Sequence, residues 1–468
     1  MESLSSLRTV AKTLTFMSED ISQEVTGEAS ESISTAQPLL TPRHGMPELV
    51  VTEAGFREVI SALRNGHGPI AIDAERASGY KYSQRAYLIQ IFRRDGGLHL
   101  IDPIAVPTPT LWKELSDTFS DQEWIIHAST QDLSCLTELG LYPKMLFDTE
   151  LGGRIAGFPR VGLGPLAETL LDLALAKEHS AVDWSKRPLN PEWLIYAALD
   201  VDVLVDLRDK VYEKLEETGK LKWAQEDFAH ILSRYAPSVQ KEPRKDPWRR
   251  TSGMHKVRDR RTFAIIKALW EARDAYAAQI DIAPGRVFND EALIATAVAK
   301  PKTLDEMRRI LTKRSRLQNL PLTDWFEAVR AALALPVEEL PELRTPSTSL
   351  PPPKLWKDRN PLGYARLTHA RAAVLARAKE LKLPVENLIS PDALRKLAWH
   401  NPPAEPDLQP YIRESLGSSE VRPWQMEQLV SLLEEPLRQR EPLVVAETVS
   451  DNPSEGASGG ASEPTDVS

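Results

Sequence analysis

The sequence predicts an α/β domain with a mixed sheet, followed by two all-α helical domains. Three observations over its 468 residues indicate this fold class. Between residues 46 and 236, short apolar runs typical of strands alternate with helical spacing, and after residue 255 the strand signals end. In the helical part, one pattern occurs twice with a constant offset of 101 residues.

The α/β domain is predicted to span residues 46–236. Its strands are short and apolar, and they are expected at residues 69–73, 87–92, 98–101 and 124–127. The second and third are predicted to pair, because Asp95, Gly96 and Gly97 supply turn residues between them. A helix is expected near residues 131–139, and helices dominate from residue 149 to 235.

The helical domains are predicted at residues 255–335 and 361–440. The segment Ile282–Leu293 matches Leu383–Leu394, and each copy places a helix N-cap residue type (Asn289, Ser390) before an acid and Ala-Leu. A basic linker at residues 237–254 precedes the first domain, and a proline-rich linker at residues 336–360 separates the two.

The two ends of the chain account for its whole net charge of −9. Residues 1–45 carry a net −3 and residues 441–468 a net −6, and both segments contain too little apolar material for a core, which predicts disorder. Residues 46–440 therefore sum to zero. The acidic balance is consequently no argument against a polyanionic partner for the folded part.

Several classes of protein are excluded by what the sequence lacks. The one cysteine, Cys135, rules out an intrachain disulfide and a cysteine-rich zinc site, and we expect no disulfide-linked partner. No apolar run approaches the roughly 18 residues of a membrane span, so no membrane association is expected. The acidic N-terminus does not resemble a targeting segment, which predicts a cytoplasmic protein.

Carboxylates stand where a core is expected. Asp73 and Glu75 end an apolar strand, and because successive strand side chains alternate, both point to one face. Two such acids repel each other unless a cation lies between them. The alternative is that the strand simply ends there and both acids face water.

Two further segments repeat this feature. Asp132 follows the strand at residues 124–127 where a helix should begin, although an acid is also ordinary in the first turn of a helix. Tyr196 and Asp200 lie one turn apart on the same face of a helix that is apolar almost all round. The alternative for that pair is a solvent-facing Asp beside a core Tyr.

Taken together, the four carboxylates Asp73, Glu75, Asp132 and Asp200 are what a site for hard divalent cations needs. Mg²⁺ prefers oxygen ligands and keeps several waters. Two such ions about 4 Å apart can activate a water and stabilise the leaving oxygen of a phosphodiester. The phenol of Tyr196 both donates and accepts hydrogen bonds, so it is suited to orient the attacking water.

The order of these residues resembles the three motifs of the DEDD exonuclease superfamily: Asp73-x-Glu75, His127-Ala-x-x-x-Asp132 and Tyr196-x-x-x-Asp200. Position 195 is Ile, where the histidine subtype has His, so the chain resembles the tyrosine subtype. Further segments are similar to the ribonuclease D family, and the helical domains resemble its two HRDC domains. Those segments are Tyr87–Phe92, Leu100–Pro103 and Asp183–Leu189.

The resemblance implies an RNase H-like fold and metal-dependent 3′→5′ removal of nucleotides, released as 5′-mononucleotides. It implies that Asp73, Glu75, Asp132 and Asp200 hold two Mg²⁺ or Mn²⁺ ions and that Tyr196 positions the water. The implied substrate is RNA with a free single-stranded 3′ end, with tRNA precursors as the expected class. Ala74 replaces a commoner Thr, and the second helical copy is the more divergent, which leaves its role open.

Six further residues are candidates for contacts with RNA. Each has a structural alternative: a satisfied core residue for Gln90, a structural histidine for His127, a helix-end ion pair for Arg187, and a solvated linker for Trp248, Arg249 and Arg250. Two other functions also stay open at this point. One is a 3′→5′ exonuclease acting on DNA, and the other is a catalytically idle nucleic-acid-binding scaffold.

Overall fold

The computed structural model describes residues 36–176, 182–239, 244–311, 320–344 and 350–443. The chain divides into two compact units, Met1–Thr345 and Pro346–Ser468. The first unit contains the predicted α/β domain and the first helical domain, and the second contains the remaining helices. Most of the two predicted disordered ends, residues 1–35 and 444–468, lies outside the described residues.

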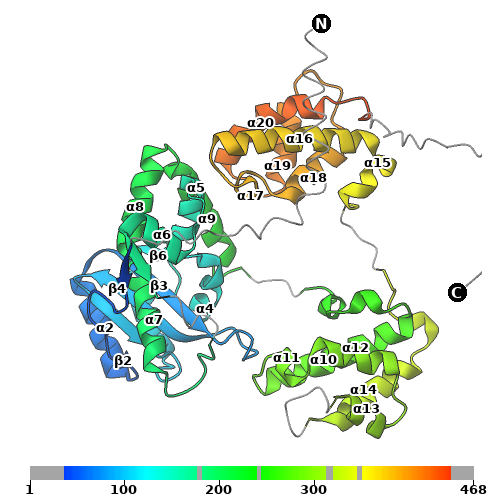
Figure 1. Cartoon of the computed structure of the whole chain (residues 1–468), viewed down its shortest axis with the longest axis horizontal. Helices are drawn as coiled ribbons and strands as arrows, with labels where there is room; N and C mark the ends of the chain where they lie inside the picture. Colours follow the sequence, from blue (N-terminus) through cyan, green and yellow to red (C-terminus); the bar gives the residue numbers. More distant parts are fainter. Residues whose placement is uncertain (1–35, 177–181, 240–243, 312–319, 345–349, 444–468) are drawn as a thin grey trace, which may run out of the picture. The chain divides into compact units, whose positions relative to one another are not determined.

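A mixed six-stranded sheet forms the centre of the α/β domain (Figure 1). Its strand order is β2-β5-β4-β3-β6-β7. The β3–β4 and β4–β5 pairs are antiparallel, whereas β2–β5, β3–β6 and β6–β7 are parallel. The strands are β2 (Leu49–Val50), β3 (His67–Arg76), β4 (Ala86–Arg94), β5 (Gly97–Ile101), β6 (Glu123–Ile126) and β7 (Met145–Asp148).

The predicted strands are confirmed, and two short strands of this sheet went unpredicted. Strand β4 is buried from Ala86 to Arg93, as its continuous apolar run indicated for a strand covered on both faces. The predicted turn joins β4 to β5, with Asp95 at φ 58° and Gly97 at φ 84° in the left-handed region that these residue types tolerate. The strands β2 and β7 were missed because each is too short to show a clear pattern.

Helices cover both faces of this sheet. Helix α7 (Pro191–Asp202) lies across β3, β4 and β5 and continues almost directly into α8 (Leu204–Glu217) (Figure 1). Helix α8 packs against α5 (Thr149–Ala156), and α9 (Leu221–Tyr235) packs against β7. The remaining helices are α2 (Glu53–Asn65), α3 (Pro109–Thr118), α4 (Leu133–Glu138) and α6 (Leu163–Leu171).

The predicted disorder of residues 1–45 is wrong for its last ten residues. Strand β1 (Gln37–Leu39) pairs in parallel with β8 (Leu173–Leu175) as a separate two-stranded sheet. Beyond it, Arg43 and His44 bond to the end of α7. Residues 1–45 as a whole are rich in Ser, Thr and Glu, and the order of the last ten comes from contacts with distant parts of the chain that composition does not reveal.

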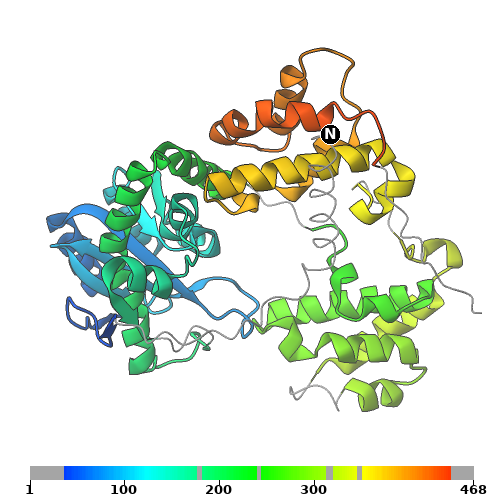
Figure 2. The same ribbon diagram turned by 45° about the horizontal axis from the view of Figure 1, so that its top comes forward.

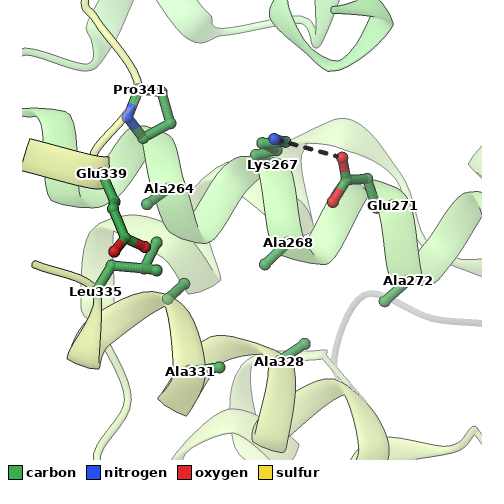
Figure 3. Close-up of a pocket in the computed structure, with 11 residues that line it drawn as sticks. Ala264, Lys267, Ala268, Glu271, Ala272, Ala328, Ala331, Leu335, Glu339 and Pro341 are labelled. Carbon is green, nitrogen blue, oxygen red and sulfur yellow. Dashed lines mark ion pairs between the residues drawn. The ribbon is translucent and has the colours of Figure 1, made fainter.

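The first helical domain packs around α10 (Arg260–Gln279). Alanines of α10 and α14 (Leu322–Ala334) face one another along a shallow groove of about 490 Å³, among them Ala268 and Ala328 (Figure 3). Small side chains at these positions let the two helices approach closely. The other helices are α11 (Pro284–Val287), α12 (Asp290–Ala299) and α13 (Leu304–Leu311).

The second helical domain has a similar succession of long and short helices. Its long helix α16 (Pro361–Glu380) packs against α18 (Pro391–Trp399) and α20 (Pro423–Leu437), as Figure 2 shows in yellow to red. Between them lie α17 (Val385–Leu388) and α19 (Gln409–Gly417), and α15 (Trp356–Arg359) precedes α16. The predicted repeat of N-caps is confirmed, because Asn289 caps α12 and Ser390 caps α18 through the same side-chain bond.

Within the first unit, the loop between β3 and β4 contacts the first helical domain. The hydroxyl of Tyr82 donates to Asp274 over 3.0 Å, and the backbone N–H of Ser83 donates to Asp281 over 2.9 Å. The guanidinium of Arg286 lies 3.9 Å from the ring centre of Tyr80. In the described part of the chain, every helix is too short or too polar to cross a bilayer.

Candidate active site

A pocket of about 420 Å³ opens at the carboxyl end of β3 and brings the predicted acids together. The predicted site residues in its lining come from three parts of the chain: the end of β3, the turn that follows β6, and the second half of α7. The predicted residues among its lining are Asp73, Glu75, His127, Asp132, Tyr196 and Asp200. Because these come from three segments that are distant in sequence, only the tertiary fold assembles them.

Three of the carboxylates converge closely. Asp73, Glu75 and Asp200 each offer one oxygen, and these three atoms lie within 4.8 Å of one another. Asp73 and Glu75 share a face of β3 as the alternation of the strand predicted, and all three residues are partly buried. The alternative in which the first two acids extend freely into water therefore does not hold.

Asp132 is the fourth carboxylate in the lining of the pocket. It stands directly before α4, yet its side chain makes no capping hydrogen bond with that helix. The carboxylate instead lies in the pocket, is 6% exposed, and has the guanidinium Nε of Arg76 at 3.6 Å. The side chain of Asp132 therefore faces the site and does not cap the helix.

Helix α7 carries the remaining pair. Asn190 caps its N-terminus by accepting the backbone N–H of Glu192 over 2.9 Å, and Pro191 begins the helix. Tyr196 and Asp200 are one turn apart, and the phenol donates a hydrogen bond to the carboxylate. The alternative of a solvent-facing Asp beside a core Tyr is excluded by this bond and by the shared pocket.

Burial and mutual repulsion govern the charges of the site. Desolvation, followed by the charge of Asp73, raises the pKa values of Glu75, Asp132 and Asp200 well above their ordinary range. Desolvation also raises the pKa of Asp73 itself, although Arg76 opposes that effect. Desolvation and the neighbouring Asp200 raise the pKa of the Tyr196 phenol, which therefore stays protonated at neutral pH.

This donor set fits divalent cations. All its ligand atoms are carboxylate oxygens, which hard ions such as Mg²⁺ and Mn²⁺ prefer. Without a cation, the crowding and desolvation of the four acids raise their pKa values and so favour the protonated forms, which a bound cation would oppose. The residues present are thus suited to the divalent cations that the sequence predicted for this site.

Asp148 is a residue of the site's scaffold that the sequence analysis missed. Its carboxylate caps α5 and also accepts the backbone N–H groups of Ala128 and Ser129 and the hydroxyl of Ser129. Those bonds hold the turn from β6 to Asp132, in which Ala128 has a φ of 53°. An acid between an apolar strand and a helix was the available signal, and it indicated no more than an N-cap.

His127 and Gln90 occupy different positions relative to the pocket. His127 lines it, with Nδ1 2.9 Å from the hydroxyl of Thr149. Gln90 pairs with Asp73 across the β3–β4 ladder and is fully buried, and neither polar atom of its side chain meets a partner within the described residues. Full burial leaves Gln90 no exposed atom for a nucleotide to contact, yet its unpartnered amide is not the satisfied core residue of the alternative either.

Arg187 lies outside the pocket lining, and the predicted contact with RNA is not what its geometry favours. Its guanidinium forms a two-point ion pair with Asp102, which is 3% exposed, and also donates to the backbone carbonyls of Tyr87 and Trp184. These bonds occupy the face that would grip a phosphate. Arg187 instead joins the loop before α7 to the sheet.

The predicted RNA track at residues 248–250 is also largely corrected. Trp248 is 2% exposed and packs edge-on against Phe263 in the core of the first helical domain, so it offers no free face for a base. Arg249 stacks on Trp248 and donates to the carbonyl of Glu342. Of these three residues, Arg250 is the exposed one.

Comparison with protein families agrees with the fold and the site. Residues 47–216 match a family model described as 3′-5′ exonuclease, and residues 262–327 match the HRDC domain. Residues 349–437 match a different model, described as 3′ to 5′ exonuclease C-terminal domain, so the second helical domain is matched by a model other than HRDC. The fold and the site therefore define a protein of the 3′→5′ exonuclease class.

Individual relatives narrow this class. The ribonuclease D of Gluconacetobacter diazotrophicus is 30% identical over 308 residues, which cover 64% of this chain and 76% of the relative. The chain belongs to the ribonuclease D family. A crystal structure of a protein from Bifidobacterium adolescentis has a TM-score of 0.78 at 35% identity, covering 86% of this chain and 99% of that one. Escherichia coli RNase D shares the fold, with a TM-score of 0.59 at 23% identity and coverage of 84% and 99%.

Proposed function

We propose that this chain is a metal-dependent 3′→5′ exoribonuclease that shortens RNA from a free single-stranded 3′ end and releases 5′-mononucleotides. One observation carries the proposal: in a member of the ribonuclease D family, three carboxylates converge within 4.8 Å beside Asp132 and Tyr196 in one pocket. Precursors of tRNA are the substrate class that we expect, and the cytoplasm is the expected location.

Asp73, Glu75, Asp132 and Asp200 are the residues that would hold two divalent cations, Mg²⁺ or Mn²⁺. When bound, such ions supply an activated water and stabilise the leaving oxygen of the phosphodiester. The carboxylates are drawn from three separate segments, so they fix the relative positions of β3, α4 and α7 whenever the site is loaded.

Tyr196 has a positioning role in this proposal. Its phenol remains protonated at neutral pH, because burial and the neighbouring acids raise its pKa. A protonated phenol bonded to Asp200 still has a lone pair that can accept a hydrogen bond from water. Tyr196 would therefore orient the nucleophile, and the proton of that water would pass to a different group.

The size of the pocket is compatible with binding one nucleotide at a time. A volume of about 420 Å³ matches the size of sites that enclose a single small ligand. Arg76, at the edge of the carboxylate cluster, is the one Lys or Arg side chain in the described lining and can meet a phosphate.

The experiment is an exonuclease assay on 5′-labelled RNA with either an unblocked or a phosphate-blocked 3′ end, in Mg²⁺ or Mn²⁺. We expect a ladder that shortens from the unblocked end, loss of activity with a chelator, and loss in Asp73→Asn. The matched control is Asp121→Asn, an exposed acid outside the site. A DNA oligonucleotide of the same sequence separates the exonuclease acting on DNA from the proposed one.

Other outcomes of this assay contradict the proposal. Activity that survives both the chelator and Asp73→Asn removes the metal-dependent mechanism. RNA binding that persists with chelator, without any release of nucleotides in Mn²⁺, supports the idle scaffold instead.

A further inference from the structure

A short segment ahead of the exonuclease domain lies against the helix that carries Tyr196 and Asp200. We call residues 36–46 the N-terminal strap. Its strand β1 pairs with β8 in the register Gln37↔Leu173, and the backbone N–H of Gln37 donates to Asp172 over 2.9 Å. The residues that match the exonuclease model begin at 47, so the strap lies outside that match.

The strap supplies the bonding partners of a fully buried acid. The side chain of Asp202, the last residue of α7, is 0% exposed. Arg43 donates through Nε to its Oδ2 over 2.8 Å and through a terminal nitrogen to its backbone carbonyl. His44 places Nδ1 2.6 Å from Oδ1. A carboxylate that is buried without such partners strongly destabilises the folded protein.

The same two strap residues reach the neighbouring helix and the sheet. Arg43 also donates to Asp206 of α8 over 2.9 Å, and Arg94 of β4 donates to the other oxygen of Asp206 over 2.7 Å. The ring of His44 lies 4.4 Å from the ring of Phe92, centre to centre, on β4. The strap thereby links the junction of α7 and α8 to the strand that pairs with β3.

This junction lies next to the proposed ligand on α7. Asp200 is two residues before Asp202, and α8 begins at Leu204, so the chain changes helices within one turn of Asp200. A ligand at a helix end has fewer backbone bonds to hold it than one in the middle. Contacts that fix the junction therefore also fix where the Asp200 carboxylate meets Asp73.

We propose that Arg43 and His44 are positioning residues, which hold the α7–α8 junction so that Asp200 and Tyr196 meet the carboxylates of β3. The inference rests on the proposed function of Asp200 as a metal ligand. It assigns a role to a segment outside the residues that match the exonuclease model, and it requires neither residue to touch RNA.

The test compares full-length Arg43→Ala and Arg43→Lys with the parent. The matched control is Arg57→Ala, an exposed arginine on α2 whose ion pair with Glu53 spans 3.8 Å. Three quantities are measured at a temperature at which circular dichroism shows each variant folded: Mn²⁺ affinity by titration calorimetry, KM for RNA, and kcat. Lysine keeps the charge but loses the fork that reaches both Asp202 and Asp206.

We expect Arg43→Ala to weaken Mn²⁺ binding by about tenfold and to lower kcat by roughly 10- to 100-fold, with KM for RNA unchanged. Arg43→Lys should recover part of both losses. A strap that only stabilises the fold would lower the melting temperature and leave Mn²⁺ affinity and kcat at parental values, and this result would overturn the inference. An inactive parent would refute the proposed function, and the Mn²⁺ titration would still test the strap.

Discussion

Arg187 and Asp102 form a two-point ion pair, with Nε 2.6 Å from Oδ2 and a terminal nitrogen 2.8 Å from Oδ1. The pair joins the loop before α7 to the end of β5, and Asp102 is almost completely buried. The same guanidinium also donates a hydrogen bond to the backbone carbonyl of Tyr87 in β4. Arg187, which the sequence predicted to bind RNA, therefore anchors the loop before α7 to the sheet.

Removing that arginine should destabilise the fold more than it affects RNA binding. Arg187→Ala leaves the Asp102 charge buried without its partner, which costs about 3–5 kcal/mol. The double variant Asp102→Ala with Arg187→Ala should lose less than the two single losses added together. Urea unfolding measures all three, and an Arg187→Ala protein of parental stability that binds RNA poorly would restore the predicted phosphate contact.

Replacing Tyr196 by Phe should separate catalysis from metal binding. The substitution removes the hydroxyl that bonds to Asp200 and leaves the ring in place. We expect kcat to fall by about 10²-fold, because the water loses its orienting partner, while Mn²⁺ affinity changes little. Single-turnover assays and calorimetry check the two parts. Unchanged kcat would show that the phenol only fills space.

The metal-free protein should gain stability from Asp200→Asn, and the gain should grow with pH. The folded-state pKa values of Glu75, Asp132 and Asp200 are raised. The contribution of these acids to folding stability is therefore fully present below about pH 4, and it is lost as the pH rises through their folded-state pKa values. An amide in place of the Asp200 carboxylate carries no charge, so one of the repelling groups is removed.

Thermal unfolding of parent and Asp200→Asn in chelator, from pH 5 to pH 8, measures this difference. We expect a variant more stable by about 1 kcal/mol at pH 8 and a smaller gap at pH 5. Added Mn²⁺ should reverse the order, since it stabilises only the protein that binds it well. A constant gap across this pH range would contradict the proposed repulsion.

Arg76→Ala should tighten the binding of divalent cations. Arg76 is a cation with its Nε 3.6 Å from the Asp132 carboxylate, so it competes with a metal ion for the same negative charge. Its loss should raise the affinity for Mn²⁺ several-fold. It should also weaken RNA binding and reduce the salt dependence of that binding by the amount expected for one phosphate contact. Calorimetry and filter binding measure these effects, with Arg57→Ala as control. Weaker Mn²⁺ binding in Arg76→Ala would refute the competition.

Arg250→Ala should change the affinity for RNA, whereas Arg249→Ala should change the stability of the protein. Arg250 is exposed, so its loss should reduce RNA affinity modestly and uniformly, with a flatter dependence on salt, and leave stability unchanged. Arg249 stacks on buried Trp248, so Arg249→Ala should lower the melting temperature of the first helical domain. Equal effects of both variants on RNA affinity at unchanged stability would favour the original RNA track.

The sequence alone indicated the residues of the candidate site and most of the elements around it. The spacings Asp73-x-Glu75 and Tyr196-x-x-x-Asp200 act within one strand and one helix, where local geometry decides which side chains share a face. The same holds for the N-caps Asn289 and Ser390, because a cap depends on residues three positions apart. Such short-range relations can be read without knowing the fold.

Only the tertiary structure decided what the remaining polar residues do. Arg187 and Trp248 have side chains suited to RNA, but the partners that bury them, Asp102 and Phe263, are supplied by other elements of the fold. The order of Arg43 and His44 depends likewise on Asp202, 159 positions beyond Arg43. A side chain's type sets which partners it accepts, whereas the packing of distant segments determines which one it meets.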